Sequence, residues 1–257
     1  MAVTTDGARL TEAHRQAQVG VRASTARDLL SLWPAFNIDD IAGSWPAIEA
    51  GLVPVVQRGH AASSELSARY YERFRTVEGV DGPWDPLRAP TPDRDDIVPN
   101  LRAAGPRKAG YGVAAGRSDV AGAVLTSIEG ELAYQVLSGG RDTLVENVME
   151  DRTALGWQRV TDGDPCPFCA MLASRGVIQK QLYRSERSAA FEAHPHCGCT
   201  AEPVWSMETQ PVGRAEEFQQ MWNDAQREAA ASDKGLNRGT DNDALNAFRR
   251  YLRANPT

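Results

Sequence analysis

Residues 156–176 read GWQRVTDGDPCPFCAMLASRG, and residues 194–199 read HPHCGC. These two stretches hold all four cysteines and two of the four histidines of the 257-residue chain, and they decide the fold expected for its second half. Cysteines gathered in this way form a site and not a framework of disulfides. Thiolate and imidazole are the ligands that Zn²⁺ prefers, in a tetrahedral arrangement. The pattern therefore predicts a small lobe that is cross-linked by a structural metal ion, with zinc as the expected ion.

The spacing of the donors favours one set of four ligands. A C-x2-C turn presents two thiolates from one tight loop, and His194 and Cys197 repeat the same spacing in the second stretch. Cys197 and Cys199, by contrast, would point to opposite faces of an extended strand unless the chain kinks at the glycine between them. The predicted metal ligands are Cys166, Cys169, His194 and Cys197, with Cys199 as the alternate ligand and His196 as the weakest candidate.

The sequence alone leaves other interpretations of the cysteines open. Cys166 with Cys169, or Cys197 with Cys199, could form a reducible pair, and the thiols could simply be buried. A catalytic cysteine–histidine dyad would need Cys166 or Cys169 as an exposed thiolate next to a base. Four protein ligands would leave a zinc ion no open position for water. The favoured site is therefore structural, and no catalytic residue is predicted.

Local patterns predict the structure around these stretches. Residues 154–161 alternate like a strand, and segments around 177–184 and 200–205 also favour extended structure. Asp162 and Asp164 are expected to form a turn rather than to act as a general acid and base. The aromatic residues expected to form the small core of this region are Trp157, Phe168 and Trp205, although Phe168 could instead be an exposed anchor.

The N-terminal part of the chain favours helices. Thr11 is expected to cap a helix that runs to Trp33, because apolar residues recur at helical spacing and Pro34 then stops it. A second helical region follows, and Pro46 and Pro54 are expected to interrupt it.

A proline-rich segment separates these helices from a longer one. Residues 79–106 contain six of the fifteen prolines, which predicts a hinge or surface loop with one short helix inside it. In the helix that follows, Ser118 can act as the cap and apolar residues recur every four positions over 120–136. Gly139–Gly140 is expected to break this helix.

These patterns together predict an α+β protein. A helical domain occupies residues 1–152, a zinc-knuckle-like α+β module occupies 153–206, and C-terminal helices occupy 207–257. The last part is expected to form one acidic amphipathic helix near 212–231 and another over 243–253.

Charge and hydropathy exclude some function classes. The chain has 28 basic and 34 acidic residues, a net charge of −6, so nucleic-acid binding is not expected to be its main role. Local contact remains open at Arg249, Arg250 and Arg253 on the last helix. No stretch approaches the roughly 18 apolar residues of a spanning helix, and the N-terminus lacks the pattern of a signal peptide. His14 and His60 are expected to be surface or capping histidines.

The cysteine region resembles a known family. Residues 156–176, followed by FEAHPHCGCTAEPVW at 191–205, are similar to the C-terminal module of the Mu F-like minor head proteins of tailed phages, and most similar to the actinobacteriophage type. The family pattern is C-x2-C, a variable extended segment, and H-P-x-C-x-C that runs into a strand. It maps here onto Cys166, Cys169, His194, Pro195, Cys197 and Cys199. The family commonly carries arginine where this chain has Gly198.

The resemblance implies a structural role in the virion. Such proteins are low-copy components that associate with the portal protein or the major capsid protein and support head assembly and DNA packaging or ejection. The acidic net charge of this chain leaves open at most a local contact with packaged DNA. The expected location is inside the capsid near the portal vertex, with assembly in the host cytoplasm and no membrane involved. No catalytic role comes with the motif, so the chain is not expected to be an enzyme. The alternative is a capsid maturation protease or another cysteine hydrolase, although no protease motif is present.

Overall fold

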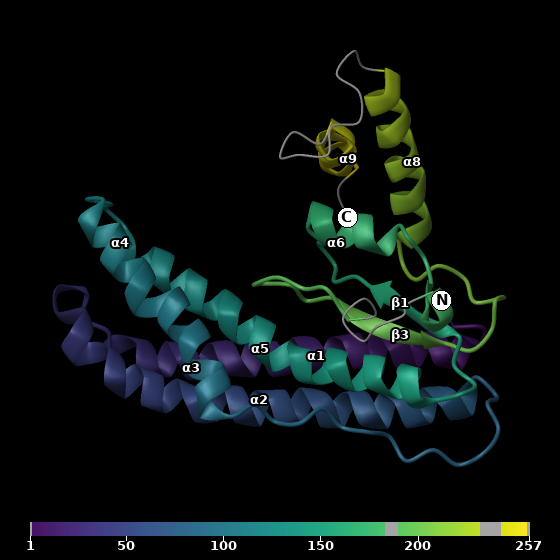
Figure 1. The fold of residues 1–257 in the computed structure, drawn as a ribbon, viewed down its shortest axis with the longest axis horizontal. Coiled ribbons are helices and arrows are strands. Elements are labelled where there is room, and N and C mark those ends of the chain that lie inside the picture. The colour runs from purple at the N-terminus through teal and green to yellow at the C-terminus, as the bar shows by residue number, and fades with distance from the viewer. Residues whose placement is uncertain (1, 183–189, 232–242, 256–257) are drawn as a thin grey trace.

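The computed structural model describes residues 2–182, 190–231 and 243–255 (Figure 1). Three long helices form a layer, namely α1 (Thr5–Leu32), α2 (Ile41–Val77) and α5 (Val120–Glu150). A small antiparallel sheet lies against this layer, and α6 (Pro167–Ala173), α8 (Ala215–Ala231) and α9 (Asp243–Ala254) lie on the other side of the sheet. The structure is 69% helical, and the predicted α+β class is confirmed.

The first helix, α1, begins earlier than the sequence predicts. The Thr4 hydroxyl accepts a hydrogen bond from the backbone N–H of Gly7 and caps the helix. Thr11 is therefore not the N-cap but a buried residue inside α1, because distant segments cover it. The predicted end is confirmed: α1 ends at Leu32, and Pro34 lies in the short 3₁₀ turn that follows.

The second helix, α2, is continuous over 37 residues, so the predicted interruptions at Pro46 and Pro54 are wrong. Each proline removes one backbone donor from the helix. However, α2 packs along both α1 and α5, and burial against these two helices outweighs the local cost. This packing depends on segments that are distant in sequence, which the local pattern cannot show.

The predicted break in α5 at Gly139–Gly140 is also wrong, because α5 is one helix of 31 residues. A Cβ atom at Gly139 would overlap the backbone oxygen of His60 on α2. A Cβ atom at Gly140 would lie 2.6 Å from the hydroxyl oxygen of Ser63, also on α2. The two glycines therefore permit the close approach of α5 and α2 rather than ending the helix.

The proline-rich segment is irregular over residues 79–93 and helical after that. Its helical part comprises α3 (Arg94–Arg102) and most of the π-helical turn η3 (Ala103–Arg107), and α4 (Lys108–Ala114) follows it. Asn147 of α5 holds the irregular part, because its side-chain amide bonds to the N–H and C=O of Leu87 at 2.9 Å and 3.0 Å. The α5 helix then begins at a cap made by Asp119 and not by Ser118, as the sequence had predicted.

The sheet has the strand order β2-β1-β3, with both pairs antiparallel. Its strands are β1 (Gly156–Val160), β2 (Ile178–Gln179) and β3 (Thr200–Val204). In the β1–β3 pair, Val160 lies opposite Thr200 and Gly156 opposite Val204. The strands predicted at 154–161 and 200–205 are thus confirmed. The segment predicted near 177–184 forms β2 and a 3₁₀ turn, and its residues 183 and 184 lie outside the described residues.

The sheet shares one hydrophobic core with the long helices. Tyr71 and Phe74 of α2 and Val148 of α5 pack in the same cluster as Trp157 of β1 and Cys169 of α6. The predicted domain boundary after residue 152 therefore crosses a continuous core, and it stays a prediction. A separate cluster joins α6, α8 and α9. Within the described ranges, no helix combines the length and the apolar character that crossing a membrane requires.

Candidate metal centre

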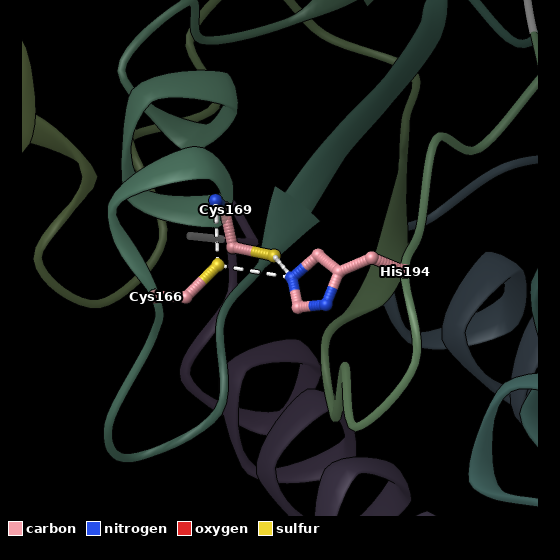
Figure 2. A group of neighbouring side chains, drawn as sticks. All are labelled: Cys166, Cys169 and His194. Atoms are coloured by element: carbon pink, nitrogen blue, oxygen red, sulfur yellow. Dashed lines mark hydrogen bonds between the residues drawn. The ribbon is translucent and has the colours of Figure 1, made fainter. Parts of the chain in front are cut away.

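The pairing of β1 with β3 brings the two cysteine stretches together. Cys166 is the N-cap of α6, which follows β1, and Cys169 lies in the first turn of that helix. The loop that carries His194 and Cys197 leads directly into β3. Because Val160 and Thr200 are opposite one another in the sheet, the loops at this end of the two strands face each other. Figure 2 shows Cys166, Cys169 and His194 converging from these two segments.

Distances within the cluster fit a tetrahedral metal site. The Sγ atom of Cys166 lies 2.9 Å from Nε2 of His194, and the Sγ atom of Cys169 lies 3.6 Å from the same nitrogen. The Sγ atoms of Cys169 and Cys197 are 3.5 Å apart. Metal–sulfur and metal–nitrogen bonds in zinc sites place neighbouring ligand atoms about 3.5–3.8 Å apart. Two of the three separations therefore match, and small movements of Cys166 would accommodate an ion.

Five donors gather in two groups that share Cys169. One group consists of Cys166, Cys169 and His194, and the other consists of Cys169, Cys197 and Cys199, with the donor atoms of each group within 4.8 Å of one another. The cluster could therefore hold a metal ion. All four predicted ligands and the alternate ligand take part, and the choice of four among the five stays a prediction.

Both cysteines of the second stretch reach the cluster, with Gly198 between them. The backbone N–H of Gly198 donates a hydrogen bond of 3.1 Å to the Asp162 carboxylate, and a Cβ atom at this position would lie 2.6 Å from the same oxygen. Cys197 and Cys199 are both buried, at 2% exposure each. The expectation that these two side chains point to opposite faces applies to a regular strand, whereas both cysteines precede β3 and follow a turn at residues 195 and 196.

The two histidines of the stretch have different orientations. His194 directs Nε2 toward the sulfur atoms, and its Nδ1 lies 2.6 Å from the carbonyl oxygen of Pro195. If Nδ1 carries the proton, it donates to that carbonyl and leaves the Nε2 lone pair for a metal. The ring of His196 instead packs over Gly130 of α5, and its backbone φ angle is +68°. His196 belongs to neither donor group, which agrees with its rank as the weakest candidate.

Hydrogen bonds among the thiols shift the pKa values of the cysteines in different directions. Hydrogen bonding from the Cys169 side chain, and from its backbone N–H, lowers the pKa of Cys166 to about 5, with a further contribution from His194. The Cys169 thiol likewise lowers the pKa of Cys197, as do Cys199 and the positive charge of Arg141. Cys169, which hydrogen-bonds to both thiolates, has a raised pKa. Metal binding would release the protons that the thiols still carry.

Two buried arginines support the cluster, and the sequence reasoning missed both. Arg141 of α5 donates hydrogen bonds to the carbonyl oxygens of Cys199 and Cys197 at 3.0 Å and 2.6 Å. The Nη1 atom of Arg159 on β1 lies 4.0 Å from the sulfur of Cys169. The ring of Phe191 lies beneath both guanidinium groups, at 5.3 Å and 3.8 Å. Buried cations require nearby negative charge, and a metal–thiolate centre supplies it.

Burial lowers the pKa of Arg141, and the thiolates of Cys197 and Cys199 oppose this shift. Its Nη1 atom is buried without a hydrogen-bond partner in the part of the chain that the structure describes. One signal in the sequence was available, because Arg141 lies one turn after Leu137 on the apolar stripe of α5. A charge on such a stripe needs an anionic partner.

One of the three aromatic residues predicted for the small core is exposed instead. Phe168 is 37% exposed, with its ring edge-on to His194, so the expectation that it packs in the core is wrong. Trp157 is buried as expected, and Trp205 packs against Tyr71 and Phe74.

The two aspartates of the predicted turn have different environments. Asp162 accepts the hydrogen bond from Gly198, and burial, together with the charge of Cys197, raises its pKa. Asp164 is exposed. The turn prediction is confirmed, since residues 161–165 form the bend between β1 and α6.

The two N-terminal histidines are buried and not on the surface, so that prediction is wrong. His14 is 5% exposed, stacks on Tyr70 at a centroid distance of 4.3 Å and lies 2.9 Å from the Ser67 hydroxyl. Burial lowers its pKa to about 3. His60 is 4% exposed, and burial also lowers its pKa. Both residues lie where two long helices cross, and the positions of these crossings cannot be predicted from the local sequence pattern.

The basic residues of the last helix are mostly engaged within the protein. Arg250 pairs with Glu228 of α8, and Arg249 donates a hydrogen bond of 2.9 Å to Asn246. Arg253 lies on the last turn of α9. Their predicted contact with nucleic acid stays a prediction.

Comparison with known proteins identifies one family. The model of the family described as VG15 protein matches residues 5–225, which include the three long helices, the sheet and all five donors of the cluster. No curated protein and no solved structure shows a significant match to the chain.

Proposed function

The chain belongs to the VG15 protein family, a family of phage gene products, and from this premise we propose that it is a structural minor head protein of the Mu F-like type. In this role it associates with the portal protein or the major capsid protein inside the head and supports head assembly and DNA packaging or ejection. The observation that carries the proposal is the convergence of C-x2-C and H-P-x-C-x-C into a single cluster, in which Cys169, Cys197 and Cys199 are buried. That convergence is what a shared metal site in the resembled module requires.

The metal in this proposal is zinc with a structural role. Cys166, Cys169, His194 and Cys197 would hold it, with Cys199 as the alternate ligand. A zinc ion would supply a cross-link between the start of α6 and the loop before β3. Four protein donors complete a tetrahedron, so no position is left for a reacting water. The five donors, their burial and the two flanking arginines support this assignment.

The long-helix layer is the part of the molecule best suited to bind a head protein. α1 exposes two large apolar side chains, Val19 at 42% and Leu30 at 56%. The net charge of −6 favours a protein partner over nucleic acid as the main contact.

Mass spectrometry of purified virions tests the proposed role. The protein should be present in a few copies per particle, and particles from a phage that lacks the gene should show defective heads or defective DNA delivery. Its absence from mature particles, with normal heads formed without it, would contradict the proposal.

One observation favours the alternative of a capsid maturation protease or other cysteine hydrolase. Cys166 is partly exposed, its pKa is lowered to about 5 by hydrogen bonding from Cys169, and Nε2 of His194 lies 2.9 Å away. These are the components of a thiolate–imidazole pair. Under this alternative, Cys166→Ser leaves the fold and metal content intact and abolishes cleavage of a head protein. Under the structural role, the same change lowers metal content and unfolds the region, because metal binding is folding free energy.

A further inference from the structure

A basic surface lies at the end of the long-helix layer away from the sheet. Residues 103–118 read AAGPRKAGYGVAAGRS and contain three cations and no acidic residue, in a chain with a net charge of −6. They form η3, α4 and the turn that leads into α5 (Figure 1). Arg107, Lys108, Tyr111 and Arg117 form this surface, the basic tip.

An exposed aromatic ring lies between the cations of the basic tip. Arg107 and Lys108 precede Tyr111 by four and three positions, so the three side chains share one face of the helical segment. Tyr111 is 76% exposed, more than any other large hydrophobic side chain that the structure describes. Arg107, Lys108 and Arg117 are exposed as well. The tip therefore presents a ring with two cations one turn before it, and Arg117 follows in the segment between α4 and α5.

Close packing on the opposite face holds the basic tip in place. A Cβ atom at Gly105 would overlap the indole ring of Trp45 on α2. A Cβ atom at Gly112 would lie 2.8 Å from a methyl group of Val120 on α5. These contacts anchor η3 and α4 to two different long helices. The exposed side chains thus project from a fixed backbone, which reduces the ordering cost of binding.

The charges of the basic tip are not neutralised within the described residues. None of its three cations forms an ion pair with a described carboxylate, whereas Arg102 and Arg94 nearby both pair with Glu49. The last helix also differs from the basic tip, because the charge of its Arg250 is neutralised by an ion pair with Glu228. The acidic residues Asp39 and Asp40 belong to the turn before α2, and Asp40 caps that helix.

We propose that the basic tip binds a single strand of nucleic acid. Phosphates bind Arg107, Lys108 and Arg117, and an unpaired base stacks on Tyr111. Positive charge along a path and an aromatic ring for stacking are the two features of single-strand binding sites. The neighbouring exposed residues are mostly alanine and glycine, which offer little of the apolar area that forms the centre of a protein interface. This proposal does not depend on a role in the virion.

Fluorescence anisotropy on the full-length chain tests the proposal. The probes are a labelled oligo(dT), an oligo(U) of the same length and a duplex of the same length, at low salt. We expect the single strands to bind more tightly than the duplex, with log K falling against log salt at a slope of about −2 for three phosphate contacts. Tyr111→Ala should weaken single-strand binding about tenfold. The triple change Arg107→Gln, Lys108→Gln and Arg117→Gln should abolish binding.

A matched control removes the same charge elsewhere. Arg9→Gln, Arg69→Gln and Arg227→Gln, which are exposed on α1, α2 and α8, should leave binding within about twofold, because these cations lie outside the tip. Thermal melts of all variants check that the fold is retained. Three results would overturn the proposal: no binding of oligo(dT) by the unmodified chain, an equal loss in both triple variants, or unchanged binding after Tyr111→Ala. The first of these would point to an acidic protein surface as the partner of the tip.

Discussion

Nε2 of His194 lies 2.9 Å from Sγ of Cys166, although 27 residues separate them in the chain. The contact exists because β1 and β3 pair in antiparallel register and place the turn after one strand beside the loop before the other. Cys169 lies between these two donors and the pair formed by Cys197 and Cys199. The cluster is therefore organised around Cys169, and this organisation leads to distinct expectations for individual residues.

Cys169→Ser should be the most damaging of the single ligand changes, because Cys169 belongs to both donor groups. We expect the apparent zinc affinity to fall by more than about 100-fold, beyond the loss caused by removing an outer hydrogen-bond partner. Competition with a zinc-sensitive dye measures this affinity. His196→Asn is the matched control, since this histidine lies outside both groups and asparagine tolerates the positive φ angle. Equal zinc affinity in the two variants would refute the assigned cluster.

Arg141→Gln should weaken the site without removing a ligand. The change removes the buried charge and at least one of the two hydrogen bonds to the carbonyls of Cys197 and Cys199. We expect a loss of zinc affinity of about 10- to 100-fold, as for other outer partners of metal ligands. The visible spectrum of the cobalt-substituted protein should shift as the thiolate geometry relaxes. Arg22→Gln is the control, because Arg22 contacts the same loop only at its exposed side; a similar loss in both variants would count against the role of Arg141.

Gly139→Ala should destabilise the protein although alanine favours helices. The added methyl group would overlap the backbone oxygen of His60, which cannot move without displacing α2. We expect a loss of about 1–3 kcal/mol in the free energy of unfolding, typical of overpacking. Gly20→Ala on the exposed side of α1 meets no atom within 4 Å and should instead stabilise by about 1 kcal/mol. Chemical denaturation of both variants gives the comparison, and a stabilising Gly139→Ala would show that the helices are not in close contact.

Acid should weaken the attachment of α2 to the sheet region through Asp151. Although burial alone would raise its pKa, hydrogen bonds from Thr153, Trp205 and Arg75 lower the Asp151 pKa from 3.8 to about 2. A lowered pKa stabilises the fold above the ordinary value, and this stabilisation is lost as the pH falls from about 4 to about 2. This shift of nearly two pKa units corresponds to about 2.5 kcal/mol.

Denaturation curves recorded across this pH range measure the effect. Asp151→Asn should reduce the pH dependence and lower stability near neutral pH, because Arg75 then loses its buried partner. Asp6→Asn, in an exposed pair with Arg9, should change little. A pH dependence between 4 and 2 that is the same in all three proteins would exclude Asp151 as its source.

The sequence predicted those features that depend on short spacing. The C-x2-C and H-x2-C patterns located the donors, and alternation located β1 and β3, because both signals lie within a few residues. The burial of His14 and the helical state of Gly139–Gly140 depend instead on which helices pack against each other. A pattern within a few residues cannot show contacts between distant segments. Arg141 illustrates the same limit, since its partners are carbonyls of Cys197 and Cys199, more than 50 residues away.

Metal analysis of the purified full-length chain tests the central claim most directly. The chain is expressed with zinc in the medium, analysed by inductively coupled plasma mass spectrometry and then melted with and without a chelator. We predict one zinc ion per chain and a lower melting temperature once the ion is removed, because structural zinc contributes its binding free energy to folding. A chain that carries no metal, and melts at the same temperature in the presence of the chelator, would contradict the account.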